Sequence, residues 1–319
     1  MKYTFYYLMA ALCCGLFVGC SSGSVALPDE PDNPETPGNE QTWTKIERVH
    51  VTADDVQSGM PSTRTSFTLD ANKLNFSWSV GDEIGIIPLI SEAESQVKMT
   101  LVTGSGEKNA TFTGGGWALR SDVTYMAYYP YQMEATTSGN TFSYAGQLQT
   151  GNASLAHLGT HDFMVTMPTS AVEEALNFTF KHLNAVAQFN LTLPIAVTVD
   201  KLTLTCNEAE LWTSAQLNFT NEGYNYDANT KDYRLSMTLD GIATTEANQM
   251  VTLYMNLPPV DLSNKTTYIV LHGTNNRVYQ GTLVPKTLES GKAYRFDATL
   301  IDATMEANID TPDFSQSEI

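Results

Sequence analysis

Few residues of this chain have the types and spacing that catalysis requires. The sequence lacks the Gly-x-Ser-x-Gly, P-loop, dinucleotide-binding and His-Glu-x-x-His patterns that bring reactive groups together. His157 and His161 stand four apart, but no glutamate lies between them and Gly159 interrupts a helix. The adjacent acids Asp54–Asp55 and Glu173–Glu174 would point to opposite faces of a strand. We therefore predict no catalytic residue, no metal site and no cofactor, and interpret the histidines as polar loop residues.

The four cysteines favour acylation over disulfide or zinc chemistry. Cys13, Cys14 and Cys20 lie in the first twenty residues, and only Cys206 stands in the body of the chain. A single body cysteine can form neither an internal disulfide nor a cysteine-based zinc site. Because Cys206 alternates with Leu204, we expect it to be a buried, unreactive thiol.

The N-terminus has the order of a sorting signal. Lys2 supplies a positive charge, and Phe5–Val18 is almost wholly apolar but shorter than the about 20 residues that span a bilayer. Gly19-Cys20-Ser21-Ser22 follows, and a small residue before a cysteine at this position resembles a bacterial lipobox. We predict a lipoprotein signal peptide at residues 1–19 and acylation of Cys20, including palmitate. An ordinary signal peptide with a chance cysteine is the alternative.

The charge balance limits the partners of this protein. The 319-residue chain has 17 Lys+Arg against 35 Asp+Glu, a formal net charge of -18. Nucleic acids and anionic lipid surfaces both attract clustered basic side chains, so binding through a basic groove is excluded for either. Only 16% of the residues are charged, while Thr, Asn, Ser and Tyr are frequent, a composition typical of exported β proteins.

Residues 20–42 form a predicted acidic spacer. Prolines recur every three residues, at Pro28, Pro31, Pro34 and Pro37, which matches the three-residue turn of a polyproline II helix. Five acids within Asp29–Glu40 add self-repulsion. Such a segment is extended, at about 3.1 Å per residue, and would hold a folded body away from a membrane.

Period-two alternation of apolar and polar residues predicts an all-β fold for the rest of the chain. The clearest runs are Leu74–Val80, Val97–Leu101, Leu183–Leu193 and Val251–Leu257. Gly- and Asn-rich turns separate these short strands, which favours β-sandwiches or barrels. One short helix is expected at Ser170–Leu176, where Ser170 and Glu173 fit a capping box.

A strand-poor stretch near the middle of the chain places the expected domain boundary at about residue 168. The prediction is two β-sandwich domains in tandem, residues 43–167 and residues 168–302. The last residues, 303–319, include Asp310, Asp313 and Glu318 and are interpreted as an acidic tail.

Five motif segments follow one another along the body of the chain. They are Thr63–Phe67 with Trp78–Gly85, Met126–Tyr131, Ala156–Met164, Phe180–Leu191 and Gly291–Phe296. Each segment alone is a weak signal. The ordered set, together with the lipobox, resembles the fimbrillin A-like (Mfa-like) family of type V pilus subunits and surface lipoproteins.

The resemblance implies two transthyretin-like β-sandwich domains and a structural, tip or accessory role in pilus assembly and adhesion. In that family a trypsin-like protease removes the N-terminal segment with its first strand, and a strand of the next subunit fills the vacated groove. Such exchange restores both the apolar contacts and the backbone hydrogen bonds. The resemblance thus implies other pilus subunits as partners, and the cell outer membrane and fimbrium as the location.

Two arginines are candidate processing sites. Arg48 lies in Thr44–Ala53, itself an expected strand, which a protease reaches only before pairing or after local opening. Arg64 lies in Ser58–Thr65, an expected exposed loop, where a cut would free the whole strand. Distance from the lipid cysteine, by analogy with the family, favours Arg48, whereas loop geometry favours Arg64. Lys45 is a lesser candidate, and a protein that is never cut stays open.

The main alternative is a surface lipoprotein that binds glycans as an accessory to nutrient uptake. Exposed tryptophans stack on sugars, and Trp43, Trp117 and Trp212 are the candidates, although core positions are the commoner use. Trp78 alternates with apolar neighbours and is expected in the core. A host protein or glycan is a further candidate partner. An enzyme that uses two carboxylates is the third hypothesis.

Overall fold

The computed structural model describes residues 44–46, 48–54, 68–70, 73–90, 96–114, 119–133, 140–172 and 175–304. Within these ranges the chain forms strands β1 to β26, one 3-10 helix and no α-helix. This composition confirms the predicted all-β class. The same residues include no helix long and apolar enough to cross a membrane.

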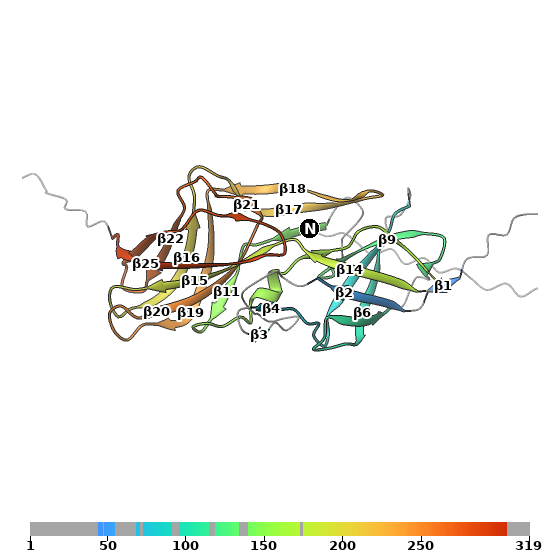
Figure 1. Cartoon of the computed structure of the whole chain (residues 1–319), viewed down its shortest axis with the longest axis horizontal. Helices are drawn as coiled ribbons and strands as arrows, with labels where there is room; N and C mark the ends of the chain where they lie inside the picture. The colour runs from blue at the N-terminus through green and yellow to red at the C-terminus, as the bar shows by residue number, and fades with distance from the viewer. Residues whose placement is uncertain are drawn as a thin grey trace, which may run out of the picture. The chain divides into compact units, whose positions relative to one another are not determined.

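An eight-stranded sheet dominates the first part of the described chain (Figure 1). Its order is β12-β14-β2-β7-β6-β5-β9-β13, and β12 also pairs with β9, so the sheet closes on itself. The bounds are β2 Val49–Ala53, β5 Glu83–Pro88, β6 Val97–Thr103, β7 Asn109–Thr113, β9 Thr124–Tyr129, β12 Met164–Val165, β13 Thr169–Ser170 and β14 Leu176–His182. Two short pairs accompany it, β1 Lys45–Ile46 with β8 Leu119–Arg120 and β3 Thr68–Asp70 with β4 Lys73–Asn75.

The second part contains a six-stranded sheet and several smaller ones. The large sheet has the order β11-β19-β16-β22-β23-β26, with β11 Leu148–Thr150, β16 Thr198–Thr205, β19 Arg234–Ala243, β22 Tyr268–Gly273, β23 Val278–Thr282 and β26 Ile301–Asp302. Two three-stranded sheets are β20-β15-β25, with β15 Ala185–Thr192, β20 Met250–Leu257 and β25 Ala293–Thr299, and β10-β17-β18, with β10 Asn140–Ser143, β17 Leu211–Thr220 and β18 Gly223–Asp232. Strand β21 Val260–Asp261 pairs with β24 Thr287–Leu288, and the 3-10 helix η1 covers Leu158–His161.

Trp78 is the centre of the first core, as its alternation predicts. Its side chain is fully buried, and Nε1 donates a hydrogen bond of 2.9 Å to the carbonyl of Lys108. Four rings meet the indole edge to face, at centroid distances from 5.0 to 5.6 Å: Phe76, Phe112, Tyr129 and Phe180. Each such aromatic pair adds about 0.5–1.5 kcal/mol of stability beyond that of its buried area. The cluster therefore stabilises the packing of strands from both sides of the closed sheet against one another.

The second core confirms two further predictions. Cys206 is buried and free, as its alternation with Leu204 indicates. Trp212 is also buried, and its ring contacts Phe142 and Tyr144 at centroid distances of 5.6 Å and 5.3 Å. The core interpretation of Trp212 therefore holds, while Trp43 and Trp117 lie outside the described residues.

The strand pairing crosses residue 168 in both directions. Strands β10 and β11 precede it but pair with β17 and β19. Strand β14 follows it but pairs with β2 and β12. The division into residues 43–167 and 168–302 stays a prediction. Any such division must allow for strands on one side of residue 168 that pair with strands on the other side.

The predicted helix at Ser170–Leu176 is wrong. Ser170 ends β13, Val172 and Ala175 form an isolated antiparallel bridge, and Leu176 begins β14. Pairing of Ser170 with Thr124 of β9 outweighs the weak local preference for a capped helix.

Val80 also departs from its predicted place in the core, because the chain turns directly after Trp78. Its side chain is 88% exposed, beside Gly81 at φ +89°. The Asp82 carboxylate closes the turn, since it accepts the Ser79 N–H at 2.7 Å and the Tyr129 hydroxyl at 2.9 Å. The Trp-Ser-Val-Gly-Asp motif is thus a buried indole followed by a carboxylate-capped turn.

Candidate functional site

Strand β2 occupies a central place in the closed sheet and is paired on both sides. It runs parallel to β14, with Val49 opposite Leu176, and antiparallel to β7, with Val49 opposite Phe112. Figure 1 shows β2 beside β14. Val49, Val51 and Ala53 point inward and are at most 3% exposed. This segment is therefore both a ladder partner and part of the apolar interior.

The neighbours of β2 form the walls of the groove that its departure would leave. Their inward side chains are apolar and almost fully buried: Ala110 and Phe112 on β7, and Leu176, Phe178 and Phe180 on β14. The facing backbone groups of both strands would lose their partners at the same time. A vacated β2 site thus combines apolar surface with open N–H and C=O groups, which is what an added strand satisfies.

The outward face of β2 carries polar side chains that fix its register against β7. His50 Nδ1 lies 3.1 Å from the Thr111 hydroxyl, and the Thr52 hydroxyl donates to Asn109 Oδ1 at 2.9 Å. These pairs are exposed, so they contribute little energy compared with the inward valines. Their main effect is to link neighbouring residues across the two strands.

Arg48 lies between two strands, and the predicted continuous strand Thr44–Ala53 is wrong. Strand β1 pairs with β8, placing Ile46 opposite Leu119, whereas β2 belongs to the closed sheet. The chain changes partners between Ile46 and Val49, and Arg48 is exposed outside both strands. A cut after Arg48 would therefore detach β1 and leave β2 in the sheet.

The other predicted site residues fall outside the described residues. Arg64 lies in 55–67 and Cys20 in the N-terminal 43 residues. What the structure does establish is the topology around Arg64, because β2 precedes it and β3 follows it. A cut after Arg64 would therefore separate both β1 and β2 from the rest of the chain.

A buried His182–Asp162 pair, which the sequence did not reveal, lies just past the end of the β2 groove. His182 Nδ1 is 2.7 Å from Asp162 Oδ1, and the two side chains are 1% and 2% exposed. Burial alone would lower the pKa of His182, but the Asp162 carboxylate together with Asp54 outweighs it, so the pKa of His182 is raised. Phe76 packs edge to face on the imidazole at 5.2 Å. Alternation of His182 with Phe180 was the available signal of its burial.

The other two histidines singled out in the sequence are half-buried, not freely solvated. His157 Nε2 bonds the Tyr254 carbonyl at 2.9 Å, and His161 Nδ1 bonds the Ser143 carbonyl at 3.0 Å. Burial lowers the pKa of His157 to about 4. His157, directly before η1, is therefore linked to β20, and His161, at the end of η1, is linked to β10. No group of three metal-ligating side chains gathers anywhere in the described ranges.

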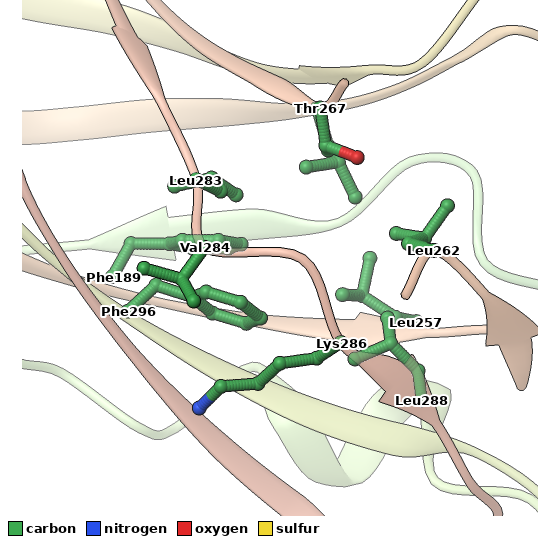
Figure 2. A pocket seen from close by; sticks show the side chains of 10 residues that line it. Phe189, Leu257, Leu262, Thr267, Leu283, Val284, Lys286, Leu288 and Phe296 are labelled. Carbon is green, nitrogen blue, oxygen red and sulfur yellow. The ribbon is translucent and has the colours of Figure 1, made fainter. Parts of the chain in front are cut away.

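An apolar pocket in the second part is too small to be a ligand site. Figure 2 shows Phe189, Phe296 and several leucines around it, with the Lys286 side chain reaching across. Lys286 Nζ lies 5.1 Å from the centroid of the Phe296 ring and donates to the Arg295 carbonyl at 3.2 Å. The free space amounts to about 10 Å³, room for about one water molecule.

Comparison with known proteins identifies the family. The sequence profile of fimbrillin-like proteins matches residues 63–312. A candidate cell adhesion protein from Bacteroides ovatus superposes with a TM-score of 0.53 at 17% identity, covering 83% of this chain and 97% of that one. No curated protein matches.

Two further solved structures are similar at lower scores. A candidate cell adhesion protein from Bacteroides uniformis has a TM-score of 0.49 at 15% identity, with 81% of this chain and 98% of that one covered. The tip fimbrial protein Mfa3 from Porphyromonas gingivalis, with a C-terminal truncation, has a TM-score of 0.35 at 9% identity, covering 80% and 99%. The profile match over most of the sequence, confirming the resemblance of the five motif segments, shows that this chain belongs to the fimbrillin-like family.

Proposed function

We propose that this protein is a lipid-anchored type V pilus subunit, assembled when a protease releases strand β2 and the next subunit fills its place. The observation that carries the proposal is the position of β2, the first strand of the closed sheet, paired on both sides. Its chain connection to β3 runs only through residues 54–67. One cut there leaves β2 held by hydrogen bonds and packing alone.

The topology favours Arg64 over Arg48 as the processing site. Release of β2 requires a cut after it, and Arg64 is the arginine that stands between β2 and β3. A cut at exposed Arg48 would free only β1, whose removal uncovers Leu119 but opens no groove in the closed sheet. Cleavage at Arg48 would thus trim the N-terminus without creating an acceptor.

Strand exchange replaces β2 by a strand of another subunit in the same groove. Which strand occupies the groove therefore depends on how well each fits it and on the local concentration of each. An incoming strand must supply small apolar side chains at alternate positions, as Val49, Val51 and Ala53 do, together with backbone groups for β14 and β7. After cleavage the fragment that carries β2 keeps the acylated Cys20 and stays with the membrane, whereas the body joins the subunits that are already gathered in the growing polymer. Mass action then favours the donated strand.

The remaining elements serve display at the cell surface. Acylated Cys20 anchors the precursor in the outer membrane, and the acidic spacer at residues 20–42 holds the body away from it. The two cores act as two transthyretin-like domains, and the subunit is structural and non-enzymatic, with a shaft, tip or accessory position in the fimbrium. Membership of a fimbrial family and the two separate aromatic cores support this assignment.

Protease treatment of the purified, lipid-bearing precursor tests the proposal. Wild type, Arg64→Gln and Arg48→Gln are each digested with a trypsin-like protease and run on gels without boiling. We expect a clip after Arg64 and SDS-resistant ladders for wild type and Arg48→Gln, and no ladder for Arg64→Gln. Ladders that require Arg48 instead would move the processing site, and no ladder in any sample would refute polymerisation.

Protease treatment of intact cells tests surface display separately. If the subunit is displayed on the outer leaflet, we expect external protease to shorten the protein on living cells. A protein that stays intact under these conditions would refute outer-leaflet exposure. The purified-precursor experiment would still report on strand exchange.

A further inference from the structure

The outer face of the six-stranded sheet holds a hollow of about 430 Å³, within the range of ligand sites. Its lining comes from four adjacent strands, β19, β16, β22 and β23. The register places the side chains in three cross-strand rows: Thr238, Lys201, His272 and Val278; Ser236, Thr203, Val270 and Gln280; Arg234, Thr205, Tyr268 and Thr282. The hollow is therefore built on the rigid sheet.

The charge in the hollow is opposite to that of the protein. Lys201 and Arg234 are exposed there, and neither forms an ion pair with any other residue in the described part of the chain. The whole chain has a net charge of -18. Asp200 lies close enough to act on His272, and the Glu208 carboxylate accepts the Thr266 N–H at 2.9 Å. Two cations without an ion pair to another described residue thus lie on one face of an acidic protein.

The two cations are far enough apart to select an extended ligand. Arg234 stands opposite Thr205, which is four residues along β16 from Lys201. At about 3.3 Å per residue the two Cα positions are roughly 13 Å apart along the strand. A single small anion meets both charges only if the two side chains stretch toward each other. A chain that carries repeated negative charges can place one charge at each.

Between the cations the surface offers hydroxyl, amide and aromatic groups. Thr203 and Ser236 share a hydrogen bond of 2.9 Å on the floor, so their hydroxyls are mutually oriented. Gln280 and Tyr268 lie half-buried on the other side. Burial and nearby Lys201 lower the pKa of His272, which keeps its imidazole neutral at pH 7 and available for hydrogen bonding.

The position of the hollow distinguishes a saccharide from a peptide. Strands β16 and β22 are central, and their backbone groups are committed to the ladder on both sides. An extended peptide gains affinity mainly by pairing its backbone at a free sheet edge, which this face does not offer. A ligand rich in hydroxyl groups bonds to the Thr, Ser and Gln side chains directly, and its rings stack on Tyr268.

We propose that this hollow binds an anionic oligosaccharide, with its carboxylate or sulfate groups on Lys201 and Arg234. The inference goes beyond the proposed function, because it needs only the folded chain and neither cleavage nor polymerisation. A subunit that failed to polymerise would still bind, and one that polymerised would do so without the ligand.

Binding of defined probes to the full, lipid-bearing chain in detergent tests the proposal. Isothermal titration at low salt uses heparin oligosaccharides, which carry sulfate and carboxylate, hyaluronan oligosaccharides, which carry carboxylate only, neutral malto-oligosaccharides and a polyglutamate peptide. We expect binding of at least one charged saccharide, weakened by added salt, and none of the neutral one. The two charged saccharides distinguish sulfate from carboxylate recognition.

Matched charge variants assign the site. Lys201→Gln and Arg234→Gln should each weaken binding about tenfold or more, the loss expected when one charge-assisted hydrogen bond is removed. Lys181→Gln is the control, since Lys181 is an exposed lysine on β14 and its loss changes the net charge equally. All three positions are on the surface, and unchanged melting temperatures confirm folding.

Several results would overturn the proposal. These are the absence of binding to either charged saccharide, equal binding of the neutral one, polyglutamate binding as tight as the saccharides, and equal losses in Lys181→Gln. Binding that survives both Lys201→Gln and Arg234→Gln would do the same.

Discussion

The side-chain amide of Gln147 forms, with the backbone of Asn256, the two hydrogen bonds that a neighbouring strand would otherwise form. Gln147 Nε2 donates to the Asn256 carbonyl at 2.8 Å, and Gln147 Oε1 accepts the Asn256 N–H at the same distance. Asn256 lies on β20, an edge strand of the three-stranded sheet. Gln149 repeats the arrangement two residues on, since it accepts the Tyr254 N–H and donates to the Thr252 carbonyl. The buried amides of 147 and 149 therefore cap this edge and block strand addition there.

Loss of the Gln147 amide should destabilise the protein strongly. Gln147→Leu leaves a buried N–H and a buried C=O of Asn256 without these bonds, at about 1–3 kcal/mol for each group. We expect a fall of roughly 2–5 kcal/mol in the free energy of unfolding, measured by chemical denaturation. Leu148→Ala at the next residue, the first of β11, is the control, because Leu148 is 46% exposed and should matter little. A Gln147→Leu protein as stable as wild type would refute the capping role.

The His182–Asp162 pair predicts a pH dependence of stability with a definite sign. Asp162, with a smaller contribution from Asp54, raises the pKa of His182 above its ordinary value of 6.5, so the stabilisation by the pair is fully present below about pH 6.5. That stabilisation is lost as the pH rises through the pKa of the folded state. We expect the difference in unfolding free energy between wild type and His182→Gln to shrink on titration from pH 6 to pH 9.

Asp162→Asn supplies the control for this prediction. Without the Asp162 carboxylate, burial still lowers the pKa of His182 and only Asp54 still raises it, so the pKa should fall below its wild-type value. The stability lost between pH 6 and pH 9 should then be smaller in Asp162→Asn than in wild type. Equal slopes in wild type and Asp162→Asn would show that the pair does not control the titration.

The alternation of apolar and polar residues correctly predicted which side chains of a strand are buried. The burial of alternate side chains in Leu183–Leu193 and the burial of Cys206 both follow from side chains alternating across a strand. Val80 fails because a turn interrupts the alternation directly after Trp78. The alternation pattern does not show at which residue a strand ends and a turn begins.

The pairing partners of the strands and the buried polar contacts could not be predicted from the sequence, because they join residues that are distant along the chain. Gln147 and Asn256 are 109 residues apart, and Asp162 and His182 are 20 apart. The candidate processing site shows the same limit. Both arginines were visible in the sequence, but only the change of partner from β8 to β14 and β7 shows that Arg48 precedes the strand that matters.

Trp78 and Val80 share one face of the predicted strand, so the pair tests where the buried part of that strand ends. Trp78→Ala removes a buried indole that contacts four rings, and should cost about 3–5 kcal/mol. Val80→Ala, at a site 88% exposed, should stay within about 0.5 kcal/mol of wild type. Thermal unfolding of both variants measures the difference. Equal losses would mean that Val80 packs in the core after all.

Weakening β2 from within should speed exchange once the chain is cut. Val51 points into the core at 2% exposure, so Val51→Ala removes two buried carbons and should lower stability by about 2 kcal/mol. The same loss makes the cut strand easier to displace. We therefore expect SDS-resistant ladders to form faster from protease-treated Val51→Ala than from wild type. Thr52→Val, which changes only the outward face of β2, is the control. Ladders from Val51→Ala that form no faster would show that departure of β2 does not limit assembly.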